Sequence, residues 1–278
     1  MANRFWVAGT ETWNSTAGAK WGTLSGVTDS ASLPGTGDVA IFDSLSGGGT
    51  VTVDSPNGAG AVTVQQITMG AFTGTLDFAA NDNNVTLSLA FDGSGTGTRT
   101  LNMGDGLWTI QGFNNNTWNY TTTTNLTHNA NGSTLSFIPS SATPTGAVTF
   151  IGGGQSFNTV TYSGVTNANP FVINGGPTIA SLQFTAPGAV TIASGTTVTI
   201  TNAFSWVGTS ANQFFFSSSS TATSATIAAA ANSTIQWAGL RRLTFTGNTV
   251  LAPNCFDLRS NAGVTITPPI GGGRVIGG

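Results

Sequence analysis

The chain has 278 residues, of which only 6% are charged, against roughly 25% in an ordinary soluble domain. Its net charge is −3, a single cysteine excludes an intramolecular disulfide framework, and no apolar run approaches the ~20 residues of a membrane-spanning helix. Residues 1–105 hold nine acids and three bases, whereas residues 106–278 hold one acid and four bases. The sequence has no stripe of basic residues that could bind along a phosphate backbone, so we expect no nucleic-acid partner, and we expect no membrane partner.

Residues 1–45 are expected to form a separate N-terminal cap or docking module. Three of the seven tryptophans, Trp6, Trp13 and Trp21, lie here among glycine and asparagine turn residues, and Phe42 ends a short strand. Large aromatic side chains in a short module either close the end of a core or anchor an interface. We therefore assign these four aromatic residues as the candidate cap and docking residues.

Residues 46–266 repeat one phrase, a short apolar–polar–apolar strand followed by a turn of small polar residues. Alternation at period two places the flanking residues of each triplet on one face, which predicts a short half-buried strand. The strands before residue 111 are predicted at 51–53, 62–67, 76–78, 85–89, 100–103 and 108–110. From residue 135 onward the triplets begin at Leu135, Val148, Val160, Phe171, Leu182, Val190, Val198, Phe204, Phe214, Ile235, Leu243, Phe256 and Val264.

Two architectures fit strands as short as these. A β-sandwich or jelly roll uses strands of about 5–6 residues and two-residue hairpin turns, and no Asn-Gly or Asp-Gly turn separates long alternating runs here. A parallel β-solenoid stacks short strands joined by variable polar turns. The steps from Leu135 to Val160, Leu182 and Phe204 are 25, 22 and 22 residues, which suits one solenoid coil each. We therefore predict an all-β parallel β-solenoid, or β-helix, with the sandwich as the alternative.

Residues 267–278 are predicted to be a C-terminal tail. Pro-Pro stops the last strand, and the glycines that follow leave the tail flexible unless a partner orders it. The ends of a solenoid expose unpaired strand edges, and a chain with so little charge has little repulsion between copies. We expect a homotrimer in which a neighbouring chain orders this tail.

Carboxylates that could cleave glycans are sparse. Between Asp105 and Asp257 the sequence has no acidic side chain. A glycoside hydrolase needs two carboxylates placed on either side of the scissile bond. Such a pair would have to come from Asp77 with Asp82, or from Asp92 with Asp105. Solvated turn aspartates are the simpler interpretation of all four.

Other motifs that could carry a catalytic or binding function are incomplete. His128, the only histidine, has no nucleophile elbow near it, and with Cys255 it supplies too few ligands for zinc. The stretch Gly93–Gly97 resembles part of a phosphate-binding loop but opens no helix. Asn81–Asn84 and Gly104–Gly106 have the residue types of calcium loops without a full ligand set. We therefore expect no catalytic residue, no cofactor and no metal.

Two segments resemble structural proteins of tailed bacteriophages. Residues 179–212 read Ile-Ala-Ser-Leu-Gln-Phe-Thr-Ala-Pro-Gly-Ala-Val-Thr-Ile and continue through Thr-Thr-Val-Thr-Ile to Phe-Ser-Trp-Val-Gly. This phrasing is similar to repeats of those proteins. The opening Ala2–Trp13, followed by Trp21 and Gly37–Asp43, is similar to their starts. The resemblance covers roughly two thirds of the chain, and it implies an exterior component of the virion, either a decoration, a fibre or a spike. It carries over no catalytic residues.

The expected function is therefore a non-enzymatic structural part of a phage virion exterior, with capsid or tail proteins as partners. The alternative is a receptor-binding tail fibre or spike that holds host surface glycans on exposed Trp, Tyr and Asn side chains. A glycan depolymerase is disfavoured by the distribution of carboxylates. The start of the chain lacks the apolar stretch of a secretory signal peptide, which suits a virion protein assembled in the host cytoplasm.

Overall fold

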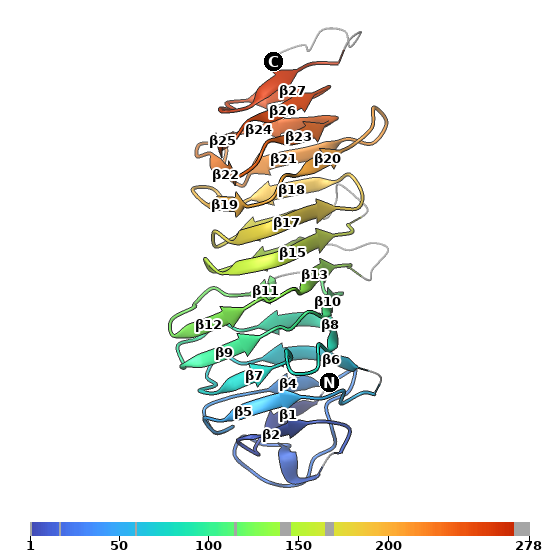
Figure 1. Ribbon diagram of the computed structural model, residues 1–278, viewed down its shortest axis with the longest axis vertical. Helices are drawn as coiled ribbons and strands as arrows, with labels where there is room; N and C mark the ends of the chain where they lie inside the picture. The colour runs from blue at the N-terminus through green and yellow to red at the C-terminus, as the bar shows by residue number, and fades with distance from the viewer. Residues whose placement is uncertain are drawn as a thin grey trace.

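The chain is a parallel β-solenoid, seen in a computed structural model that describes residues 2–16, 18–58, 60–113, 116–139, 146–164 and 170–269. Short strands stack along one long axis, from the N-terminal coil at the bottom of Figure 1 to the C-terminal coils at the top. Among the described strands, the ladders are parallel except where β1 (Asn3–Trp6) meets β3 (Trp21–Gly22). Parallel stacking confirms the predicted solenoid and excludes the sandwich, whose neighbouring strands are antiparallel.

Each coil contributes up to three strand segments, so the solenoid has three faces. Face 1 contains β1, β4 (Val39–Ile41), the second halves of β6 (Ala61–Thr68) and β8 (Asn84–Asp92), β11 (Asn116–Asn119), β14 (Val148–Ile151), β16 (Phe171–Asn174), β18 (Ala189–Ile192), β21 (Phe214–Ser218), β24 (Ala238–Arg241) and β27 (Phe256–Arg259). Face 2 contains the first halves of β6 and β8, then β10 (Leu107–Ile110), β13 (Thr134–Phe137), the second halves of β15 (Ser156–Tyr162) and β17 (Thr178–Phe184), β20 (Ser205–Val207), β23 (Ser233–Gln236), β26 (Val250–Pro253) and β28 (Thr265–Thr267).

Face 3 completes the coil. It contains β2 (Glu11–Trp13), β5 (Thr50–Val53), β7 (Thr75–Asp77), β9 (Arg99–Asn102), β12 (Leu126–Asn129), the first residues of β15 and β17, β19 (Thr197–Ile200), β22 (Ala225–Ala229) and β25 (Leu243–Gly247). A short 3₁₀ helix, η1 (Gly18–Lys20), precedes β3. The strands β6, β8, β15 and β17 each pass around a corner and therefore belong to two faces.

The register agrees with the predicted spacing for two steps and departs from it at the third. Leu135 pairs with Val160, and Val160 pairs with Leu182. The next triplet, at Phe204, is not the ladder partner of Leu182. The ladder of face 2 is interrupted between β17 and β20, and the indole Nε1 of Trp206 donates to the carbonyl of Leu182 at 2.9 Å instead.

Alternating side chains point inward and fill the interior, as the triplets predict. In β19 the two apolar residues are buried, and the two threonines that alternate with them face outward. Aromatic rings stack along much of the core, with centroid separations of 4.3 Å for Phe91 and Trp118 and 4.1 Å for Phe204 and Trp206. Offset and edge-to-face rings add to the stabilisation that burial alone supplies.

The ends of the predicted body do not coincide with ends of the strand stacks. Strands β1 and β2 pair in parallel with β4 and β5, so part of the predicted module 1–45 forms the first solenoid coil. At the other end β28 includes Thr267, the first residue of the predicted tail. Residues 270–278 of that tail lie outside the described residues.

Candidate functional site

The four predicted cap residues lie together inside the N-terminal coil. Trp6, Trp13, Trp21 and Phe42 are all buried. The Trp21 ring lies 5.2 Å from Trp6, 5.3 Å from Trp13 and 5.7 Å from Phe42 between centroids, each in an edge-to-face arrangement. Phe42 continues the cluster to Phe72 at 5.6 Å. Because these rings are buried, they cannot contact a partner directly. Docking at this end stays a prediction, and it would have to use other side chains.

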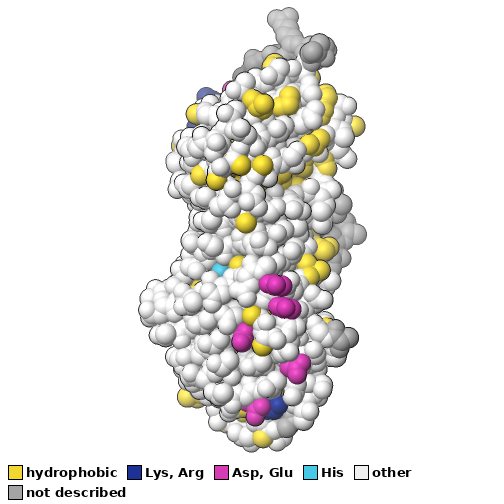
Figure 2. Space-filling model, viewed as in Figure 1, with side chains coloured by type: hydrophobic (Ala, Val, Ile, Leu, Met, Phe, Trp, Pro, Cys, Tyr) yellow, Lys and Arg dark blue, Asp and Glu magenta, His cyan; other side chains and the backbone are white. Residues whose placement is uncertain are grey.

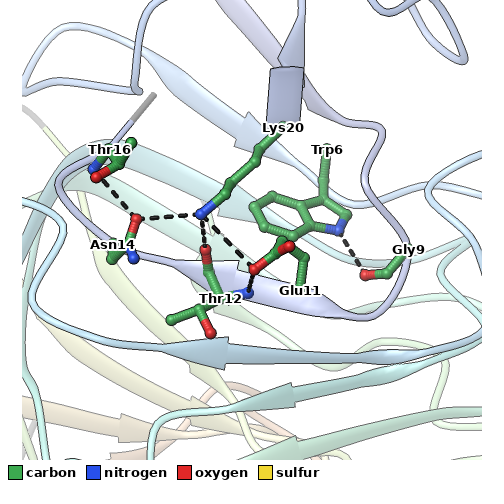
Figure 3. Close-up of polar contacts among 7 residues, drawn as sticks. All are labelled: Trp6, Gly9, Glu11, Thr12, Asn14, Thr16 and Lys20. Atoms are coloured by element: carbon green, nitrogen blue, oxygen red, sulfur yellow. Dashed lines mark hydrogen bonds and ion pairs between the residues drawn. The ribbon is translucent and has the colours of Figure 1, made fainter. Parts of the chain in front are cut away.

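Backbone groups at the N-terminal edge are covered by the segment that follows the first coil. Strand β3 pairs with the edge of β1 that β4 leaves free. On β2, the Lys20 ammonium donates to the carbonyl of Thr12 at 2.8 Å and lies 3.8 Å from the Glu11 carboxylate, as Figure 3 shows. An uncovered strand edge is a template for pairing with other chains. This end is therefore protected against strand addition at β1.

The candidate catalytic aspartates act as hydrogen-bond acceptors between stacked turns. An Asp82 carboxylate oxygen accepts the backbone N–H of Asp105 at 2.8 Å, and Asp105 accepts the N–H of Gly132 at 2.8 Å. Asp77 accepts a backbone N–H of its own turn, and Asp92 accepts a backbone N–H and an asparagine amide. Burial raises the pKa of Asp92. The structure thus brings together Asp82 and Asp105, which come from different predicted pairs. Neither predicted pair shares a hydrogen bond in the described coils.

The asparagines of the candidate calcium loop are also engaged by neighbouring coils. Asn83 is fully buried, donates to the carbonyl of Val53 at 2.9 Å and accepts the N–H of Ser55 at 2.8 Å. Asn84 accepts the N–H of Leu107 at 2.9 Å. Within the described ranges, no group of three His, Cys, Asp or Glu side chains is placed to hold a metal ion.

The glycine-rich stretch Gly93–Gly97 stacks on neighbouring turns and does not form a phosphate cradle. Its backbone N–H groups at Gly93 and Gly95 donate to carbonyls of the next coil. A Cβ on Gly95 would lie 1.8 Å from the carbonyl oxygen of Gly70, so only glycine permits this approach. The amides of Gly93, Ser94 and Gly95 are therefore already used in hydrogen bonds within the protein.

Arg99 joins these turns from inside the molecule, and sequence analysis missed it. Its guanidinium is buried and donates to four carbonyl oxygens at 2.6–3.0 Å, those of Gly93, Gly97, Thr122 and Thr124. Burial lowers its pKa, and the nearby Asp92 and Tyr120 act in the opposite direction. Arginine stays charged in proteins, so this is a buried cation neutralised by backbone dipoles. Its role is to hold the turns of two coils together.

His128 occupies an inward position of β12 beside an interruption in the ladder of face 3. It shares a 2.9 Å hydrogen bond between Nδ1 and the phenol oxygen of Tyr120, and its ring lies 4.7 Å from that of Phe157. Burial lowers the pKa of His128 to about 4, and the backbone of Ser156 offsets this in part. The imidazole is therefore neutral near pH 7, and the half-buried side chain packs against the core rings of Tyr120 and Phe157.

The aromatic side chains offer no large exposed platform for sugars in the part of the chain that the structure describes. Six of the seven tryptophans and both tyrosines are buried, and the seventh tryptophan, Trp237, is partly buried. Stacking of an aromatic face on a sugar ring requires that the face be accessible. A receptor-binding role would accordingly rest on the Asn and Thr side chains of the turns.

The C-terminal coil leaves apolar side chains uncovered. Two grooves, of about 390 and 350 Å³, flank strand β27 and share Phe256 and Leu258. The second groove also contains Ile266, Pro268 and the buried thiol of Cys255. Figure 2 shows apolar side chains gathered over these upper coils on the face in view. In the described structure β27 and β28 have a ladder partner on one side only, so this end is the best candidate for an interaction surface.

Comparisons with known proteins supply no relative. No protein-family model, no curated protein and no solved structure matches the chain. The described residues contain no helix with the length and apolar character needed to cross a membrane. The class of protein is therefore defined by its fold alone, a parallel β-solenoid with three faces.

The first prediction concerns the indole N–H groups of the cap. The Nε1 of Trp6 donates to the carbonyl of Gly9 at 2.9 Å, whereas the buried Nε1 of Trp13 has no partner (Figure 3 shows the former). We expect Trp13→Ala to lower the free energy of unfolding by about 3–5 kcal/mol, because it opens a cavity. Trp13→Phe should cost less than Trp6→Phe, because only the latter strands a carbonyl, at about 1–3 kcal/mol. Urea denaturation of the three variants measures this, and equal losses for the two phenylalanine variants would contradict it.

The second prediction concerns the buried guanidinium. We expect Arg99→Lys to destabilise the protein by about 2–4 kcal/mol, because an ammonium has three donors and no planar fork for four carbonyls. Arg259→Lys is the matched control, since Arg259 is exposed and should change stability by less than about 0.5 kcal/mol. Thermal denaturation of dilute protein compares the two. Similar melting temperatures for both variants would show that the hydrogen bonds of the buried Arg99 guanidinium contribute little to stability.

The third prediction concerns pH. The pKa of His128 is about 4 in the folded chain and 6.5 when unfolded. Between these values the unfolded chain binds the extra proton, so the stability present above pH 6.5 is lost as the pH falls toward 4, by about 3 kcal/mol at most. His128→Phe should flatten the profile of unfolding free energy in this window. Tyr120→Phe is the comparison variant: it removes the hydrogen bond to Nδ1 but keeps the imidazole, whose pKa is lowered mainly by burial, so most of the slope should remain.

Proposed function

We propose that this protein is a non-catalytic structural component of a virion exterior, either a head decoration protein or part of a tail fibre. The observation that carries the proposal is how the chain uses its polar side chains. Arg99, Asp82, Asp105 and Asn83 all bind the backbone of the same or a neighbouring turn and stack coil on coil. In this chain, polar side chains of the kinds that an enzyme would direct at a substrate instead stabilise the stacking of coils into a rod.

The assignment to a phage is supported by the resemblance of two segments to tailed-phage structural proteins. The longer of them, residues 179–212, runs from β17 through β20 and therefore lies in the solenoid body. The shorter one, residues 2–13, forms β1 and β2 of the first coil. Partners would be other virion proteins of the capsid or tail, and a homotrimer ordered through residues 267–278 stays a prediction.

The alternatives have less support. A receptor-binding fibre that holds host surface glycans would need exposed aromatic rings, whereas most Trp and Tyr rings of the described chain are buried. A glycan depolymerase would need two free carboxylates facing a groove, whereas Asp82 and Asp105 accept backbone hydrogen bonds.

The fourth prediction is that antibodies against the purified chain label purified phage particles from the source lysate, and that the chain is present in many copies per particle by quantitative mass spectrometry. The same purified chain should release no reducing ends from capsule or lipopolysaccharide of the host. Its absence from purified particles would overturn the virion assignment. Reducing-end release that one Asp82→Asn or Asp105→Asn change abolishes would overturn the non-catalytic assignment.

A further inference from the structure

The N-terminal end carries an exposed apolar patch outside the buried cap. Leu24, Val27 and Leu45 are 63%, 43% and 61% exposed. They are neighbours, because the Leu45 side chain lies over Gly26 and the N–H of Val27 bonds to the carbonyl of Leu24. We call these three residues the tip patch. Clustered aliphatic side chains of this size on a solvated end are typical of contact surfaces.

Unneutralised carboxylates accompany the tip patch. Residues 1–45 contain four acids and two bases, a net charge of −2. The two bases are occupied, since Arg4 lies 3.9 Å from Asp38 and Lys20 pairs with Glu11. Asp29 and Asp43 have no basic partner in the described structure and accept hydrogen bonds from Thr and Ser side chains near the patch.

The C-terminal end has the opposite charge around its apolar grooves. We call Phe256, Leu258, Ile266 and Pro268 the end patch, of which Leu258 is 45% exposed. Residues 240–269 contain three bases and one acid, a net charge of +2. Among the described residues no carboxylate lies within ion-pair distance of these three arginines, Arg241, Arg242 and Arg259. The one acid, Asp257, accepts a hydrogen bond from Asn261.

We propose that the end patch of one molecule binds the tip patch of a second copy of this chain. Both surfaces are apolar at the centre, and their free charges have opposite signs, which favours this pairing over tip with tip or end with end. In a chain with 6% charged residues, the two ends carry net charges of opposite sign, −2 for residues 1–45 and +2 for residues 240–269. The two patches differ, so the contact is heterologous and open and adds copies along the solenoid axis.

This contact is separate from the predicted homotrimer and from the assignment to a virion. A closed trimer has a fixed mass once it is formed, whereas an open head-to-tail contact gives a mean mass that rises with protein concentration. Added salt should weaken the contact, because exposed charges are screened beyond about 10 Å at 0.1 M salt.

The fifth prediction uses two blocking variants of the full chain. Leu45→Gln removes apolar area from the tip patch, and Leu258→Gln removes it from the end patch. Sedimentation velocity from micromolar to submillimolar protein should show that each change weakens self-association about tenfold or more. Leu107→Gln is the matched control: Leu107 is 43% exposed on β10, in the middle of the rod, and its replacement should have no effect. Circular dichroism melts establish that all three variants remain folded.

A mixing experiment decides the direction of the contact. At a concentration where each blocked variant is monomeric, an equal mixture of Leu45→Gln and Leu258→Gln should form dimers and nothing larger, because one intact end patch meets one intact tip patch. A wild-type chain that stays monomeric throughout, or a mixture that gives no dimer, overturns the proposal. So does a trimer indifferent to both variants. Association that appears only after deletion of residues 270–278 would overturn it too, because the chain's own terminus would then be the occupant of the end patch.

Discussion

The structure depends on the parallel hydrogen-bond ladder that joins each coil to the next. Because parallel strands lie about 4.8 Å apart, every outward side chain faces its equivalent on the neighbouring coil, and stacked like charges would repel. The ladder therefore accounts for a surface of Thr, Asn and Ser with few ions. It also explains why turns need glycine where they touch: a Cβ on Gly97 would meet the carbonyl oxygen of Phe72 at 2.2 Å.

The same ladder determines what happens to the residues that could carry chemistry. Inside a stacked turn, backbone groups that no ladder partner reaches still need hydrogen bonds, since an unsatisfied buried group costs about 1–3 kcal/mol. Asn83 and Arg99 supply them from within the coil, and Asp82 and Asp105 supply them from the surface of the turns. The side chains of Asp82, Asp105 and Arg99 are consequently part of the scaffold, which is why motifs that look catalytic in sequence are occupied in the described coils.

The repeated triplets were sufficient to predict the solenoid and the pairing of Leu135, Val160 and Leu182, because both follow from local periodicity. The interruption before β20 could not be predicted, since the step from Leu182 to Phe204 has the same 22 residues as the paired step from Val160 to Leu182. The buried position of Arg99 had a signal in the sequence that was not used. Arg99 has the same parity as Leu101 and Met103, so alternation already places it inward.

The two ends of the rod solve the same physical problem in different ways. A stack of coils must terminate twice, and each terminus leaves both a strand edge and an open apolar core. At the N-terminus β3 pairs with the edge, and three tryptophans with Phe42 fill the core, so the exposed large apolar side chains described at this end are those of the tip patch. At the C-terminus the described chain stops at β27 and β28 with a free edge on each. Because the described residues terminate the rod differently at its two ends, the rod has a direction, and its contacts with other molecules must differ at the two ends.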